Sequence, residues 1–161
     1  MNTGHAIALA LRTAYLAMHR RADATVARFG VTADQYVLLA ALAEADALTQ
    51  QDLTDRVGSD ASTVRAMLLL LENRGLVARG PHPSDGRARH VALTPFGRSA
   101  YRKMREGSEA FRTRLLAAVG PGQADLLLGL LGQIARAMDL PEGQSARRRR
   151  RGRGAESAAA E

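Results

Sequence analysis

The chain has 161 residues, a formal net charge of +7 at pH 7, and 46% hydrophobic, 24% charged and 4% aromatic residues. This length allows one domain with a buried core, which we expect to consist of Leu, Val, Ala and Met in a soluble globular protein. The absence of cysteine excludes disulfides, thiolate metal ligands and thiol-based redox sensing.

The longest apolar runs, at residues 37–43 and 126–128, are far too short to span a bilayer. Residues 1–10 lack the charged start and the long apolar stretch of a signal peptide. We therefore expect a cytoplasmic protein that has no membrane partner.

Positive charge is concentrated near the C-terminus. Residues 141–161 contain six Arg and three Glu (+3), whereas residues 1–140 contain 17 Lys or Arg and 13 Asp or Glu (+4). A polyanionic partner such as DNA is favoured by such charge. Because residues 141–161 show no apolar period, they are predicted to form a disordered, Arg-rich tail.

The N-terminal part of the chain predicts two helices. Apolar residues recur at steps of three and four along residues 5–29, which places them on one face of a long helix. Gly30 suits the left-handed position that ends such a helix. Thr32 and Gln35 have the spacing of a capping box, which starts a second helix ending near Glu44.

Two further helices are predicted in the middle of the chain. Thr49 and Asp52 form another capping box for a short helix. Asp60, or Ser59 just before it, caps the next helix, which ends near Gly75.

Residues 76–79 and 89–93 are predicted strands, joined by a loop rich in Pro, Gly, Ser and Asp at 81–88. Two helices followed by two antiparallel strands are the plan of a winged helix-turn-helix, in which one helix enters a DNA groove and a β-hairpin flanks it.

The C-terminal part predicts a fifth helix and a sixth. Thr94 and Pro95 supply the N-cap and the first helical residue of the fifth, in which Gly107 is a weak point. Its apolar stripe consists of Phe96, Ala100, Met104, Phe111 and Leu115. A short, very apolar helix follows over residues 126–138.

Two stretches of the sequence carry a family signature. They are VTADQYVLLAALAEADALTQQDLTDRVG and STVRAMLLLLENRGLVARGPHPSDGRARHVALTPFGR. With Ser-Thr-Val, Leu-Glu, Gly-Leu-Val, a D-x-R wing and Leu-Thr-Pro-x-Gly, the chain resembles the MarR family of bacterial regulators (multiple antibiotic resistance regulator type). The resemblance is close over residues 30–105 and extends to the order and length of the flanking helices.

This resemblance implies a mainly α fold with a small β-wing and about six helices. Residues 1–140 would form a single domain, in which the helices at 5–29 and 95–138 form a homodimer interface and residues 32–94 form the winged helix-turn-helix lobe. The dimer would place two recognition helices in successive major grooves of a pseudo-palindromic operator in double-stranded DNA. A small, often aromatic or phenolic, effector bound between the dimer helices and the lobe would release the DNA.

The fourth predicted helix carries the candidate base contacts. Val64, Met67, Leu68 and Leu71 are placed to face the core, and the opposite face offers Ala61, Ser62, Arg65, Ala66 and Leu69. Arg65 is the best candidate because Arg binds guanine O6 and N7 with two hydrogen bonds. Ser62 and Thr63 could bind phosphate or a base edge. The alternative is that the two hydroxyls support the helix start and Arg65 is a solvated charge.

This helix departs from the family pattern. Leu69 and Leu70 occupy positions where Asp-Arg is common, and Ala66 stands where a polar residue is frequent. The exposed face is therefore expected to be unusually apolar.

The predicted wing carries the stronger evidence for DNA binding. Asp85 and Arg87 match the D-x-R pattern, in which Arg enters the minor groove and Asp holds it in place. A narrow minor groove attracts a guanidinium because it concentrates negative potential. Arg89 adds a candidate phosphate contact, and an ordinary turn role remains the alternative for Asp85.

Tyr15, His19 and Tyr36 lie on the helices that line the family's effector cleft, and are the candidate ligand residues. The alternative is that they are ordinary core residues. The four histidines show no metal-ligand spacing, so we expect no metal site and no cofactor.

The sequence contains no phosphate-binding glycine loop, no G-x-S-x-G motif and no cysteine nucleophile, so an enzyme is not expected. The leading interpretation is a ligand-responsive transcriptional repressor. The alternatives are a winged-helix protein-interaction module, suggested by the apolar recognition helix, and a non-specific DNA-binding protein driven by the Arg-rich tail.

Overall fold

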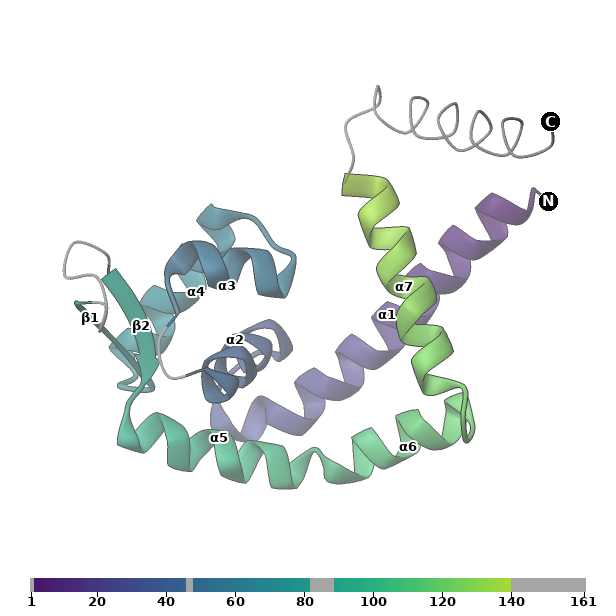
Figure 1. Cartoon of the computed structure of the whole chain (residues 1–161). Coiled ribbons are helices and arrows are strands. Elements are labelled where there is room, and N and C mark those ends of the chain that lie inside the picture. The colour runs from purple at the N-terminus through teal and green to yellow at the C-terminus, as the bar shows by residue number, and fades with distance from the viewer. Residues whose placement is uncertain (1, 46–47, 82–88, 140–161) are drawn as a thin grey trace. The chain divides into compact units, whose positions relative to one another are not determined.

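The computed structural model describes residues 2–45, 48–81 and 89–139. Within these residues the chain is mostly helical and has one two-stranded antiparallel sheet, which confirms the predicted fold class (Figure 1). The elements in chain order are α1 (Thr3–Val26), the 3-10 helix η1 (Ala27–Phe29), α2 (Ala33–Glu44), α3 (Gln50–Val57), α4 (Ala61–Asn73), β1 (Val77–Pro81), β2 (Arg89–Leu93), α5 (Pro95–Gly107), α6 (Glu109–Val119) and α7 (Ala124–Asp139).

The chain divides into two compact units, Met1–Arg112 and Thr113–Glu161. The first unit contains α1 to α5 and the sheet, with its hydrophobic core between them. The core is built mainly from leucine and valine, as the composition predicts. Its fully buried members are Val26, Leu38, Leu39, Leu42, Leu53, Val64, Leu68, Leu71, Val77 and Met104.

The helix starts follow from local capping chemistry. Thr32 with Gln35, and Thr49 with Asp52, form the two predicted capping boxes, in which each side chain accepts the other residue's backbone N–H. Thr94 accepts the N–H of Gly97 and so caps α5, which has proline in its first turn. Each predicted cap is confirmed because it depends only on residues three or four apart.

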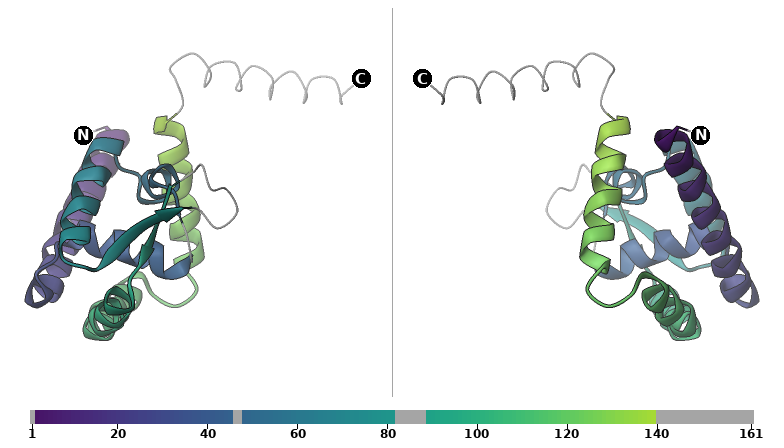
Figure 2. Two further views of the ribbon diagram at one scale, coloured as in Figure 1. Left: turned by 90° about the vertical axis from the view of Figure 1, so that its left-hand side faces the viewer. Right: turned by 90° about the vertical axis from the view of Figure 1, so that its right-hand side faces the viewer.

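The sheet is a short hairpin ribbon. Val77 pairs with Leu93 at its base and Pro81 pairs with Arg89 at its far end. The two strands pair side by side along their whole length and can be followed in the left view of Figure 2. The first strand is shifted from the predicted residues 76–79, because Leu76 instead donates its N–H to the carbonyl of Leu71 at the end of α4.

The predicted fifth helix is in fact two helices, so the described residues contain seven α-helices and not six. α5 ends at Gly107, the residue of low helix propensity, and α6 begins at Glu109. Between them, the Ser108 N–H donates to the carbonyls of Met104 and Arg105, and its hydroxyl donates to the Arg105 carbonyl. Ser108 is buried and also contacts the Tyr36 hydroxyl.

α1 and α7 are among the helices that expose large apolar side chains. The N-terminal half of α1 projects away from the rest of the first unit (Figure 1) and exposes Ile7 and Leu9. α7 exposes a row of apolar side chains, which are Leu126, Leu127, Leu128, Leu130, Leu131, Ile134 and Met138. Rows of exposed apolar side chains are typical of helices that pack against another molecule.

Among the described residues, no single helix combines the length and the hydrophobicity needed to cross a membrane, although two sharply bent helix pairs pass that test by length and composition.

Candidate nucleic-acid interface and effector cleft

The helix-turn-helix consists of α3 and α4. α3 ends at Gly58, which has a left-handed φ of +63° and donates its N–H to the Thr54 carbonyl. Only glycine adopts this backbone readily, so it fixes where the first helix stops. α4 begins three residues later at Ala61, with Asp60 as its N-cap.

α4 has one buried face and one exposed face. Val64, Leu68 and Leu71 are fully buried in the core, which confirms the predicted inward face. Arg65 and Ala66 are exposed on the other side. The buried leucines hold the helix in place, and the exposed side is left available to a partner.

Asp60 organises the N-terminus of α4. Its carboxylate accepts the backbone N–H of Thr63 at 2.8 Å, the hydroxyl of Thr63 at 2.7 Å and the hydroxyl of Ser62 at 2.5 Å. These hydrogen bonds, led by the one from Ser62, hold the Asp60 pKa far below its usual value. Both hydroxyls therefore donate to Asp60 in this structure, and both residues are exposed to solvent.

The exposed face of α4 continues into apolar residues. Leu69 and Leu70 are each 53% exposed, as the departure from the family pattern predicts. A partner that covers this face would therefore meet aliphatic carbon as well as the Arg65 guanidinium.

The hairpin lies next to the end of α4. Arg79 on β1 forms an ion pair with Glu72 on α4, with 3.3 Å between Nε and Oε2. Leu48 forms an isolated bridge with Val91, so the segment before α3 pairs with β2. Arg89 is exposed at the first position of β2, and Asp85 and Arg87 lie outside the described residues.

A cleft of about 460 Å³ lies between α1, α2, the α3–α4 turn and α4. Its lining includes the predicted Tyr15 from α1, Asp34 and Val37 from α2, and Thr63 and Met67 from α4. It is large enough for a small organic ligand. A ligand here would contact both the long N-terminal helix and the recognition helix.

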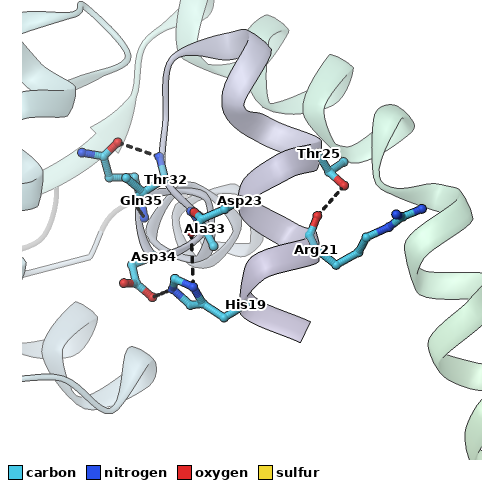
Figure 3. Close-up of polar contacts among 8 residues, drawn as sticks. All are labelled: His19, Arg21, Asp23, Thr25, Thr32, Ala33, Asp34 and Gln35. Atoms are coloured by element: carbon cyan, nitrogen blue, oxygen red, sulfur yellow. Dashed lines mark hydrogen bonds and ion pairs between the residues drawn. The ribbon is translucent and has the colours of Figure 1, made fainter. Parts of the chain in front are cut away.

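His19 lies beside this cleft. Its ring centroid is 5.4 Å from that of Tyr15. Nδ1 lies 3.3 Å from an Asp23 carboxylate oxygen and Nε2 lies 3.3 Å from one of Asp34, which joins α1 to the start of α2 (Figure 3). The second Asp23 oxygen accepts the backbone N–H of Ala33 at 2.6 Å. The imidazole is thus held between two carboxylates.

Tyr36 is not part of this group. Its hydroxyl lies 3.2 Å from the Ser108 hydroxyl, and its ring stacks on Tyr101 at 5.7 Å. Desolvation, followed by the neighbouring Tyr36, raises the pKa of Tyr101 above its usual value. The structure therefore brings Tyr15 and His19 together and places Tyr36 in the packing between α2 and α5.

Comparison with known proteins agrees with this geometry. Residues 29–88 match a model described as the MarR family. The HTH-type transcriptional regulator YdgJ of Bacillus subtilis (strain 168), itself uncharacterised, is 32% identical over 105 residues, which cover 65% of this chain and 64% of YdgJ. The transcriptional repressor CouR, solved with a 23-mer DNA duplex, is 30% identical with a TM-score of 0.69, and the match covers 78% of this chain and 89% of CouR.

The chain belongs to the MarR family. BpsR of Bordetella bronchiseptica, from a structure concerned with regulation of its DNA binding by 6-hydroxynicotinic acid, is 28% identical with a TM-score of 0.70; the match covers 87% of this chain and 95% of BpsR. The matched region thus spans slightly less than two thirds of YdgJ but most of each of the two solved structures.

One part of this MarR-family chain was not singled out from its sequence. Phe29, Arg74, Phe96 and Lys103 line a second hollow, although the sequence predicts only an apolar stripe for the α5 residues. The one local signal is Phe96, an aromatic residue at the x position of Leu-Thr-Pro-x-Gly. Among the described residues, no group of three His, Asp or Glu side chains is placed to hold a metal ion.

Proposed function

We propose that this MarR-family chain is a homodimeric, non-enzymatic transcriptional repressor that binds a pseudo-palindromic operator and is released by a small ligand. The observation that carries the proposal is α4, a helix fixed in the core by Val64, Leu68 and Leu71 while its Arg65 side faces solvent beside a hairpin. A helix of this kind can enter a major groove without disturbing its own packing. The likeness to CouR, solved with DNA, supports it.

The proposed contacts divide by chemistry. Arg65 would bind a guanine edge, and Arg87 would enter the minor groove with Asp85 positioning it. Arg89, at the far end of the hairpin, would contact phosphate. Ser62 and Thr63 donate their hydroxyl protons to Asp60, so they would accept hydrogen bonds from base amino groups. Alternatively, the two hydroxyls would rotate away from Asp60 and donate to a DNA phosphate.

The decisive test is the affinity for the promoter of its own or the adjacent gene, measured by fluorescence anisotropy with Arg87→Ala. We expect a loss of roughly tenfold to a hundredfold, because a specific Arg contact contributes about 1–3 kcal/mol. Arg102→Ala, an exposed residue on α5, is the matched control and should change affinity little. An Arg87→Ala protein that binds the promoter DNA as tightly as the parent would contradict the proposal that this protein is a repressor.

Dimerisation is supported by the exposed apolar faces of α1 and α7, which a second copy of the chain would cover. The resulting dimer would act in the cytoplasm on chromosomal DNA, with two α4 helices about one turn of DNA apart.

For the effector, we propose an aromatic or phenolic ligand in the cleft beside Tyr15 and His19. Because 6-hydroxynicotinic acid regulates DNA binding by the similar protein BpsR, this compound is a reasonable first probe. It should weaken operator binding in the parent protein but not in Tyr15→Ala. If the compound weakens operator binding equally in the parent and in Tyr15→Ala, the ligand binds outside this cleft.

The second candidate is a protein-interaction module, and the exposed Leu69 and Leu70 favour it. The two candidate functions predict different effects of two double variants. Leu69→Gln with Leu70→Gln would abolish a protein interaction, whereas operator binding would be abolished by Arg65→Ala with Arg87→Ala.

A further inference from the structure

A second hollow of about 340 Å³ lies in the first unit, away from the effector cleft, and shares no lining residue with it. It is formed where η1, the end of α4 and one face of α5 meet. Its lining residues are Phe29, Arg74, Leu76, Phe96, Ser99, Ala100, Lys103 and Met104. Its volume lies in the range of small-molecule sites.

The inner surface of this hollow is apolar. Met104 and Leu76 are buried parts of the core, and they present carbon to the cavity. Phe96 lies at the edge of the hollow, with 64% of its surface exposed. The next residue, Gly97, packs closely against the Leu76 backbone and so fixes the chain at this point. An apolar ligand group would remove this aromatic surface from water, which is favourable in proportion to the area covered.

The rim of the hollow is cationic. Arg74 and Lys103 both line it, and Lys103 also lines an adjoining hollow together with Arg28 and Glu106. The Arg74 guanidinium lies directly over Gly30, so closely that a Cβ on that glycine would be 2.1 Å from Nη2. Among the described residues, neither Arg74 nor Lys103 forms an ion pair with a carboxylate.

We propose that this hollow binds a small amphipathic carboxylate. Its carboxylate would lie between Arg74 and Lys103, and its aromatic or short acyl body would lie against Phe29, Phe96 and Met104. Two cations with no carboxylate partner within residues 2–45, 48–81 and 89–139, above a buried apolar floor, match a ligand that has one negative end and one apolar end. The proposal does not depend on DNA binding or on the cleft beside Tyr15.

The site is joined to the recognition helix. Arg74 is the C-cap of α4, and the next residue but one, Leu76, donates its N–H to Leu71 of α4. A bound carboxylate would therefore hold the C-terminal end of α4, whereas a ligand in the first cleft contacts Thr63 and Met67 nearer its start.

The methionines provide a direct test. The chain has five, of which Met104 lines this hollow and Met67 lines the effector cleft. The full-length protein, labelled with ¹³C at the methionine methyl groups, is titrated with sodium octanoate and observed by NMR. Loss of a peak in Met104→Leu and in Met67→Leu assigns the two signals, since this exchange conserves volume.

We expect the Met104 methyl signal to shift to saturation while the Met67 signal stays in place. 1-Octanol, which has the same chain without the charge, should bind about tenfold more weakly, because it loses the charge-assisted hydrogen bonds. Lys103→Gln should weaken octanoate binding by a similar factor. Arg102→Gln, the neighbouring exposed position that lines neither hollow, is the matched control and should leave it unchanged.

Three results would overturn the proposal. A Met104 signal that does not move means that no ligand enters. Equal affinity for octanoate and 1-octanol means that the cations take no part. Equal losses in Lys103→Gln and Arg102→Gln mean that only general surface charge is involved. Because no readout uses DNA, these outcomes are independent of the repressor proposal.

Discussion

At the scale of single residues, Asp60 is the N-cap of α4, the candidate recognition helix. Three hydrogen bonds converge on its carboxylate, two of them from the hydroxyls of the candidate DNA contacts Ser62 and Thr63. A carboxylate at a helix N-terminus also interacts favourably with the helix dipole. The same residue therefore serves the fold and orients the hydroxyls of Ser62 and Thr63.

We predict that Asp60→Ala lowers the melting temperature by a few degrees at pH 7, measured by circular dichroism. Because the folded-state pKa of Asp60 is lowered, its stabilising effect is present above the unfolded value of about 3.9 and is lost as pH falls toward the folded value. The gap between parent and variant should stay constant from about pH 7 to pH 4 and narrow below that.

Asp60→Asn is the matched variant, because it keeps a capping oxygen without the charge. It should lose less stability than Asp60→Ala at pH 7. Below about pH 4, where the charge is being lost from the parent, it should approach the parent's melting temperature. A gap that widens in acid would contradict this account of the pKa.

At the scale of elements, α5 is attached to the hairpin through a close approach at Gly97. A Cβ at this position would lie 1.9 Å from the Leu76 carbonyl oxygen, a backbone atom that a side-chain rotation cannot move away. Glycine is required here by space and not by backbone conformation, since Gly97 is not among the glycines with positive φ.

We predict that Gly97→Ala lowers the free energy of unfolding by about 1–3 kcal/mol or more, as overpacking of a tight site does. Urea denaturation measures this value. Gly4→Ala is the control, because the nearest heavy atom to its Cβ is 3.6 Å away and alanine has the higher helix propensity. Equal stability of Gly97→Ala and the parent would show that α5 can move away from the strand base.

The elements also show what the sequence could predict. Capping boxes, the αL glycines at helix ends and the hairpin were predictable because each depends on neighbouring residues or on apolar period. Gly107 was identified as a weak point, but the break at Ser108 was not predicted, because the Ser108 hydroxyl contacts Tyr36, which lies 72 residues earlier. Tyr36 is separated from Tyr15 and His19 because it lies on the face of α2 that packs against α5. The apolar period of the sequence does not reveal which element each face of α2 packs against.

At the scale of the whole molecule, the exposed stripe of α7 predicts self-association. Leu130→Arg would place a charge in an interface formed by apolar side chains, and we expect it to shift the protein to single chains in sedimentation velocity. Gln133→Arg on the same helix adds the same charge beside the stripe and should leave the dimer in place. A Leu130→Arg protein that remains dimeric would exclude this part of α7 from the interface.

The Arg-rich residues 141–161 lie outside the described residues, so their role remains a prediction. Truncation after residue 140 should weaken binding to operator and to random DNA by the same factor. The slope of log affinity against log salt should become shallower by up to about five, since up to six Arg–phosphate contacts are lost. Unequal losses, measured by anisotropy titration in several salt concentrations, would mean that these residues recognise sequence.

The exposed Leu69 and Leu70 would give the proposed DNA binding a distinctive heat capacity change. In the proposed complex they would be covered by DNA, for which thymine methyl groups are the apolar counterpart. Dehydration of this aliphatic surface makes the heat capacity of binding more negative, whereas ion pairing with phosphate is seen mainly in salt dependence. Calorimetric titrations at several temperatures should therefore give a less negative heat capacity change for Leu69→Gln with Leu70→Gln than for the parent.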